Sequence, residues 1–127
     1  MKYRIKKETK PTLSTFGKYK AVASHHQTVE TGQLIKEVSA GEPYTEGTVE
    51  AVVWKLAKVI NRHLREGDKV RLNDFGLMKL EIESDKVDAP EDFKPNKHIK
   101  GVRLHFLPES AKGSPELYKK IKFEKEV

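Results

Sequence analysis

The chain has no cysteine, so it can form neither disulfide bonds nor thiolate metal sites. It also has no apolar run approaching the roughly 20 residues that a membrane-spanning helix needs. The basic N-terminus is not followed by the apolar stretch of a secretory signal, so we expect a cytoplasmic protein. There is no nucleophile motif, phosphate-binding glycine loop or paired-carboxylate arrangement. We therefore expect neither an enzyme nor a cofactor.

A metal centre is not expected either. His25 and His26 are adjacent, so on a strand they would face opposite sides, and no nearby carboxylates have a metal-ligand spacing. His63 falls on an apolar helix stripe and is expected to be a core or interface histidine. Trp54 lies off the centre of that stripe, and we expect it to pack rather than to stack on a base.

The chain is basic, but its charge is unevenly placed. It has 127 residues and a net charge of +6, enough for one small domain plus an extension and favourable to a polyanionic partner. Residues 1–27 hold seven Lys or Arg and one Glu, whereas residues 28–127 hold eighteen basic and eighteen acidic residues. The extension therefore carries the net charge. It is either a binding segment or a solvated basic tail.

The middle of the chain has the clearest structural pattern. Apolar residues at three-and-four spacing between 49 and 64 predict an amphipathic helix. Gly67 stands where a helix C-terminus favours a residue free to adopt positive φ. Residues 70–72 and 78–82 then alternate apolar and polar side chains, which indicates two strands with one buried face. Phe75 and Gly76 mark the turn between them.

This arrangement resembles the HU and integration host factor family of bacterial histone-like proteins. The motif is Leu-x-x-Gly-Asp-x-Val-x-Leu-x-x-Phe-Gly, carried by Leu64, Gly67, Asp68, Val70, Leu72, Phe75 and Gly76. The resemblance covers roughly residues 28–123. It implies an α+β fold in which an intertwined dimer has a helical body, a three-stranded antiparallel sheet and a β-arm. It also implies DNA binding and bending.

We expect two segments: a basic extension at 1–27 and an HU-like domain at 28–127. The extension contains two possible strands, at residues 1–5 and 19–23, which could pair and join a sheet edge. In the domain, Thr28 or Thr31 is expected to cap a short first helix, and Thr45 or Thr48 the long second helix. Ser114, Pro115 and Glu116 predict the start of a C-terminal helix that reaches Ile121.

The resemblance implies that the β-arm covers about residues 84–100. Pro90 lies sixteen residues before Phe106, where the family has the proline that wedges between base pairs. Its neighbours depart from the family, because Asp88, Glu91 and Asp92 are acidic and would repel phosphate. The strand that returns from the arm is free of acids between residues 94 and 105. Its alternation places Arg103 and His105 opposite the apolar Val102, Leu104 and Phe106.

We expect architectural, largely sequence-independent binding of double-stranded DNA by a dimer in the nucleoid. The alternative is an HU-like module that binds a protein partner or serves a structural role, which the neutral domain and acidic arm favour; RNA binding is a third reading. Arg103 and Lys100 are the first candidate contacts. The further candidates for DNA contact are Lys97, Lys94, His105, Lys79, Lys86, Pro90, Lys119, Lys120, Lys6 and Lys7.

Overall fold

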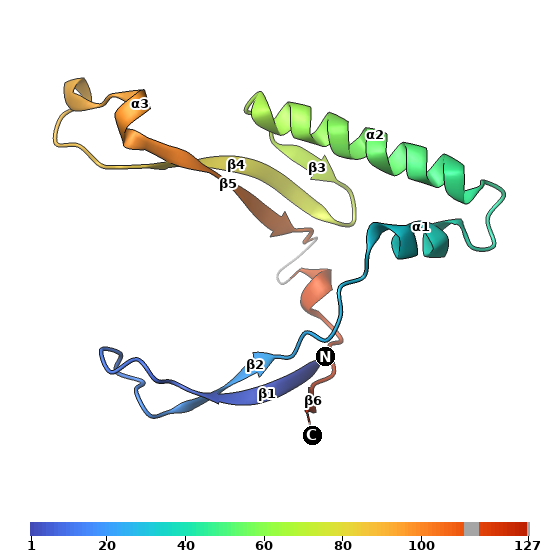
Figure 1. Ribbon diagram of the computed structural model, residues 1–127, viewed down its shortest axis with the longest axis horizontal. Coiled ribbons are helices and arrows are strands. Elements are labelled where there is room, and N and C mark those ends of the chain that lie inside the picture. The colour runs from blue at the N-terminus through green and yellow to red at the C-terminus, as the bar shows by residue number, and fades with distance from the viewer. Residues whose placement is uncertain (111–114, 127) are drawn as a thin grey trace.

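The computed structural model describes residues 1–110 and 115–126, which form two sheets and a pair of packed helices (Figure 1). The body contains α1 (Thr31–Ser39), α2 (Glu46–Arg65) and an antiparallel sheet, ordered β3-β4-β5, of β3 (Val70–Leu72), β4 (Gly76–Ser84) and β5 (Ile99–Pro108). The second sheet has the order β2-β1-β6, from β1 (Lys2–Lys7), β2 (Tyr19–Ala23) and β6 (Glu124–Lys125). The expected α+β class and three-stranded antiparallel sheet are confirmed.

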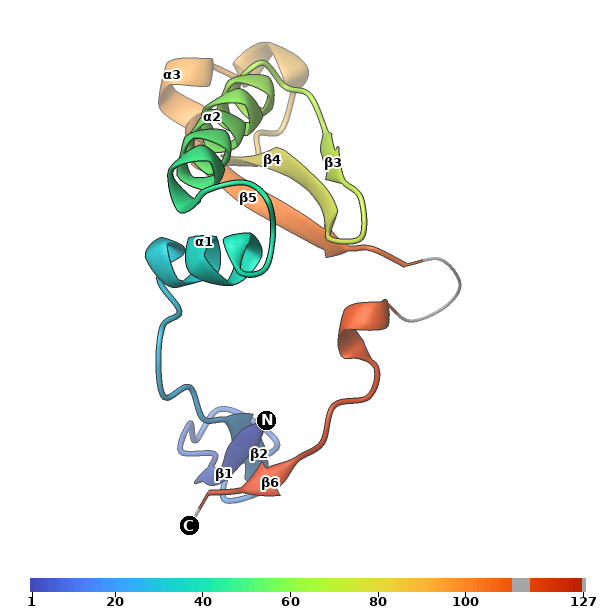
Figure 2. The ribbon, with the colours of Figure 1, turned by 90° about the vertical axis from the view of Figure 1, so that its right-hand side faces the viewer.

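The second sheet lies apart from the body and holds both chain ends (Figure 2). The two predicted N-terminal strands pair with each other, with Ile5 opposite Ala21. They do not add to the body sheet but form a separate sheet, in which β6 pairs in parallel with β1. The N-terminal amino group of Met1 donates to the Lys122 carbonyl at 2.6 Å, and the Glu124 amide donates to the Met1 carbonyl at 3.1 Å. The C-terminal segment therefore fastens the start of the chain.

Helix α2 begins and ends at residues that the sequence predicts. The Thr45 hydroxyl accepts a hydrogen bond from the Thr48 amide at 3.2 Å, so Thr45 is the N-cap. Glu46 places a negative charge at the positive end of the helix dipole. Gly67 follows the last turn with φ of 92°, a conformation that costs glycine little because it has no Cβ.

Helix α1 begins differently from the prediction. Its N-cap is Glu30, which is extended and makes no side-chain capping bond, whereas Thr31 is the first helical residue. Thr28 lies in the extended segment before it. Neither predicted cap is used, and the helix is held by its packing against α2, with the side chain of Ile35 buried.

The Phe75–Gly76 corner requires its glycine. Asp74 turns the chain with φ of 64°, and the rings of Phe75 and Phe106 then lie 4.9 Å apart. A Cβ atom on Gly76 would lie 2.5 Å from the Leu107 carbonyl oxygen and 2.6 Å from the Phe106 ring. Glycine is therefore the residue that lets β4 pair closely with β5.

The core of a single chain is small. The buried apolar side chains of the described residues are Ile35, Val49 and Leu64. Val102 and Leu104, expected to make core contacts, are 62% and 53% exposed. The side chains that should complete a core are therefore open to solvent within one chain. None of the described helices has the length and apolar character needed to cross a bilayer.

The segment expected to be a strand-built arm has a different structure. Strand β4 ends at Ser84 and β5 begins at Ile99, and between them lie the 3₁₀ helix η1 (Pro90–Asp92) and the short helix α3 (Pro95–His98). The prediction of a ribbon over residues 84–100 is therefore wrong in its strand content. Each short helix has a proline in its first turn, where fixed φ and the missing N–H favour helix over a sheet ladder.

The predicted C-terminal helix is also wrong. A single 3₁₀ turn, η2 (Glu116–Tyr118), is present, after which Lys119 is extended and Lys120 has φ of 60°. The predicted N-cap, Ser114, lies outside the described residues. The chain stays extended beyond Lys120 because it must reach the second sheet, where its pairing with β1 replaces local helical bonds.

Candidate nucleic-acid interface

The β4–β5 ribbon separates polar from apolar side chains as the alternation predicts. Its register places Lys79 opposite His105 and Glu81 opposite Arg103, so these four share one face. Leu80, Ile82, Val102 and Leu104 share the other face. The candidate contacts Lys79, Arg103 and His105 therefore lie together.

Their charges are balanced by acidic neighbours on the same face. Glu81 lies 3.4 Å from Arg103, 3.7 Å from Lys79 and 4.0 Å from His105. Glu83 adds a second carboxylate 3.8 Å from Arg103. These pairs are exposed and individually weak, but they cancel the local positive potential. A phosphate would have to compete with Glu81 and Glu83 for the same cations.

The loop between β4 and β5 collects the next candidates. A shallow hollow of about 460 Å³ is lined by Lys86, Lys94 and Lys97 together with Asp88 and Asp92. Lys100 is close in sequence to these lining residues, and its ammonium lies 3.2 Å from the carboxylate of Asp85. Pro90 is exposed at the first position of η1, not at the turn of a two-stranded ribbon.

The remaining candidates lie away from this ribbon. Lys119 and Lys120 belong to the segment that connects the two sheets, and Lys119 pairs with Glu116 at 2.7 Å. Lys6 and Lys7 are consecutive on β1 and so point to opposite faces. The ammonium of Lys7 lies 6.0 Å from the centre of the Tyr19 ring, whereas Lys6 is directly opposite Lys20.

A carboxylate that sequence reasoning missed lies at the base of the second sheet. The Ser24 hydroxyl donates a 2.5 Å hydrogen bond to Glu126, and His26 lies 3.6 Å from the same carboxylate. The Ser24 bond, followed by the charges of His26, Arg4 and Lys2, lowers the pKa of Glu126. Since Ser24 and Glu126 are about a hundred positions apart, no local sequence pattern indicates this contact.

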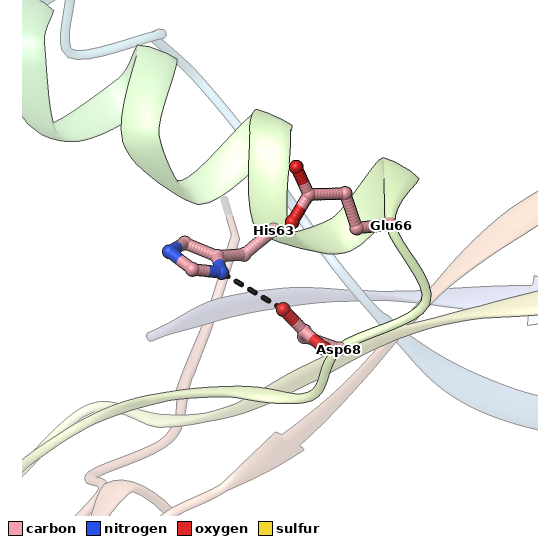
Figure 3. A group of neighbouring side chains, drawn as sticks. All are labelled: His63, Glu66 and Asp68. Carbon is pink, nitrogen blue, oxygen red and sulfur yellow. Dashed lines mark hydrogen bonds and ion pairs between the residues drawn. The ribbon is translucent and has the colours of Figure 1, made fainter.

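A second unexpected cluster joins the end of α2 to β3 (Figure 3). One ligand atom from each of His63, Glu66 and Asp68 lies within 4.8 Å of the others, close enough to hold a metal ion. The His63 Nδ1 and Asp68 carboxylate are already hydrogen-bonded at 2.8 Å. We interpret this pair as a structural link between helix and strand. His63 is thus half-buried and hydrogen-bonded, not a core histidine, and its place at an interface stays a prediction.

Comparison with known proteins places the chain in a family. Curated proteins yield no match to this sequence. A family described as "HU domain fused to wHTH, Ig, or Glycine-rich motif" matches residues 1–125, which include both sheets and both long helices. The HU domain in this description agrees with the HU-like motif at residues 64–76. The chain therefore belongs to the HU-HIG family of HU-like proteins.

Proposed function

We propose that this protein is an architectural DNA-binding protein that acts as a homodimer and bends duplex DNA with little sequence preference. Its HU-like family suggests a DNA-binding architectural role. The observation that carries the proposal is the small, incomplete core of the single chain. A second copy could cover the apolar side chains that one HU-like chain leaves exposed. Catalysis has no part in this proposal.

The exposed apolar surface supports a dimer. Val52 on α2 is 60% exposed and lies between two shallow apolar hollows. One hollow is lined by Ala51, Val52, Lys55, Leu56 and Val59, and the other by Val38, Tyr44, Thr48, Val49, Val52 and Val53. Ile82, Val102 and Leu104 expose a further apolar strip on the β4–β5 ribbon. A second copy that covers both surfaces would remove from water the area that one chain leaves exposed.

The DNA contact is proposed to use basic side chains on phosphates, since such contacts need no base recognition. Arg103 and Lys100 remain the first candidates on the body, and Lys97 and Lys94 come next. The β4–β5 ribbon projects beyond α1 and α2, with α3 at its outer end, so two copies would present two projecting ribbons (Figure 1). A duplex that bends to meet both would gain further phosphate contacts, which is how bending is compensated in such complexes.

The test combines mass and binding measurements on the full chain. Light scattering should give twice the mass of one chain. A labelled duplex should bind at low salt and lose affinity steeply as salt rises. Energy transfer between dyes at the duplex ends should increase on binding if the duplex bends. A monomer, or a dimer that leaves the duplex unbound at low salt, contradicts the proposal.

A protein-interaction role is the second candidate. It is favoured by the balanced charges of the β4–β5 polar face, where Glu81 and Glu83 pair with the cations that would otherwise meet phosphate. The same binding experiment separates the two functions. Dimers that ignore duplex DNA even at low salt would favour the interaction role.

A further inference from the structure

The β1–β2 hairpin has one strongly basic face. Alternation along β1 places Lys2, Arg4 and Lys6 on one side, away from Tyr3, Ile5 and Lys7. The pairing register adds Lys20, which is directly opposite Lys6. Lys10 and Lys18 continue the positive charge at the closed end of the hairpin, where the Glu8 amide donates to the Lys18 carbonyl at 2.8 Å.

The outer part of this face has four lysines and one carboxylate, that of Glu8, which accepts a hydrogen bond from the Lys10 amide at 3.0 Å. Within residues 1–110 and 115–126, the ammonium groups of Lys6, Lys10, Lys18 and Lys20 have no carboxylate within ion-pair distance, and all four residues are exposed. Like charges directly opposite on paired strands are destabilising. The ammonium groups of Lys6 and Lys20 therefore repel each other, and a bound polyanion would reduce this repulsion.

The base of the same face is partly neutralised. Glu126 accepts the Ser24 hydrogen bond and lies in the field of Arg4 and Lys2, which helps to keep it ionised. The free positive charge is consequently concentrated toward the closed end of the hairpin. The β4–β5 polar face differs, because there Glu81 and Glu83 lie beside the cations.

We infer that the basic face of the β1–β2 hairpin, made by Lys6, Lys10, Lys18 and Lys20, is a phosphate-binding site for duplex DNA and supplies most of the protein's electrostatic affinity. This inference rests on the proposed function and adds a second contact to it. The hairpin and the β4–β5 ribbon project toward the same side of the molecule, so one duplex could meet both (Figures 1 and 2). A two-stranded ribbon also has the dimensions to follow a DNA groove.

The test compares two triple variants of the full chain with equal loss of charge. The hairpin variant carries Lys6→Gln, Lys18→Gln and Lys20→Gln. The matched control carries Lys36→Gln, Lys58→Gln and Lys69→Gln, three exposed lysines of the body. Duplex affinity is measured from 50 to 300 mM salt, and circular dichroism with thermal melting checks that both variants fold. The hairpin variant should fold at least as well as wild type, since it removes the Lys6–Lys20 repulsion.

The hairpin variant should lose far more affinity than the control. Loss of three phosphate contacts makes the negative slope of log affinity against log salt shallower by about 2.7. This corresponds to a loss of duplex affinity on the order of several hundred-fold near 0.1 M salt. The control should change the slope by less than about 1, because its lysines affect DNA binding only through the net charge of the protein.

The outcomes separate this inference from the proposed function. A wild-type chain that fails to bind the duplex overturns the proposed function itself. If wild type binds and the two triple variants bind alike, only the hairpin inference fails. Single-stranded RNA and phosphatidylserine vesicles serve as competing polyanions. Tighter binding to either one through the same three lysines would overturn the assignment to duplex DNA.

Discussion

The substitution Val52→Asp tests whether the exposed apolar face of α2 is a dimer interface. Val52 lies at the junction of the two apolar hollows on α2, and 60% of the residue is exposed in one chain. If a second copy covers this face, the aspartate would bury an unpaired charge at the interface. We therefore expect the variant to fold as a monomer or to dissociate at micromolar concentration.

The size of the effect follows from the area still open to burial. Complete burial of a valine side chain contributes about 1.5–3 kcal/mol, so covering the exposed 60% contributes about 1–2 kcal/mol in each chain. A two-fold dimer contains this contribution twice, so the substitution removes about 2–4 kcal/mol of dimer stability. This loss raises the dissociation constant of the dimer roughly 30-fold to 700-fold. Desolvation of the carboxylate adds to this loss.

The assay is sedimentation over a range of concentrations, with Asn61→Asp as the matched control. The Asn61→Asp substitution adds the same charge as Val52→Asp. Asn61 lies nine positions further along α2, about two and a half turns away, and so on the opposite side of the helix. Far-ultraviolet circular dichroism of the 20-residue helix α2 reports whether each variant remains folded, because Trp54 is 60% exposed and its fluorescence would change little on unfolding. Equal dissociation constants for the two variants would refute the α2 interface.

Three further substitutions test the other contacts. Gly76→Ala places a Cβ 2.5 Å from a strand carbonyl and should cost about 1–3 kcal/mol in denaturant unfolding, whereas Gly101→Ala, with open space around its Cβ, should cost far less. Ser24→Ala should raise the pKa of Glu126 toward its ordinary value in an NMR titration. Because folding lowers this pKa, ionised Glu126 stabilises the fold at pH values above its ordinary pKa. This stabilisation is lost as the pH falls through the lowered pKa of the folded protein. Glu81→Gln should free its paired cations and raise duplex affinity roughly tenfold near 0.1 M salt; unchanged affinity would show that the ribbon face does not meet DNA.

The sequence predicts the parts of the fold that local chemistry determines. The cap at Thr45, the positive φ at Gly67 and the turn before Gly76 each depend on residues within a few positions. The strands β1 and β2 are also predictable, since each shows local alternation and the two are neighbours in sequence. The family motif then supplies the order of these elements in the body.

The parts that sequence reasoning missed depend on distant partners. The extended C-terminal segment reads locally as a helix, but its partner is β1 at the other end of the chain. The arm differs, because its short helices begin locally at Pro90 and Pro95, although the position of Pro90 relative to Phe106 matches a strand-built arm. Charge pairing is equally non-local, because Glu81 meets Arg103 only once the β4–β5 register is fixed.

The placement of charge also links dimer formation to DNA affinity. Each chain offers the four lysines of the proposed site, Lys6, Lys10, Lys18 and Lys20, none of which makes an ion pair with residues 1–110 or 115–126, and a dimer offers twice that number. If all eight contacted phosphates of one duplex, log affinity would fall against log salt with a slope of about −7, whereas one hairpin alone would give about −3.6. A variant that dimerises poorly, such as Val52→Asp, should therefore show the shallower slope as well as weaker binding. If the slope stays near −7 in a confirmed monomer, the eight hairpin lysines are not its source, and the coupling between the α2 interface and DNA binding is wrong.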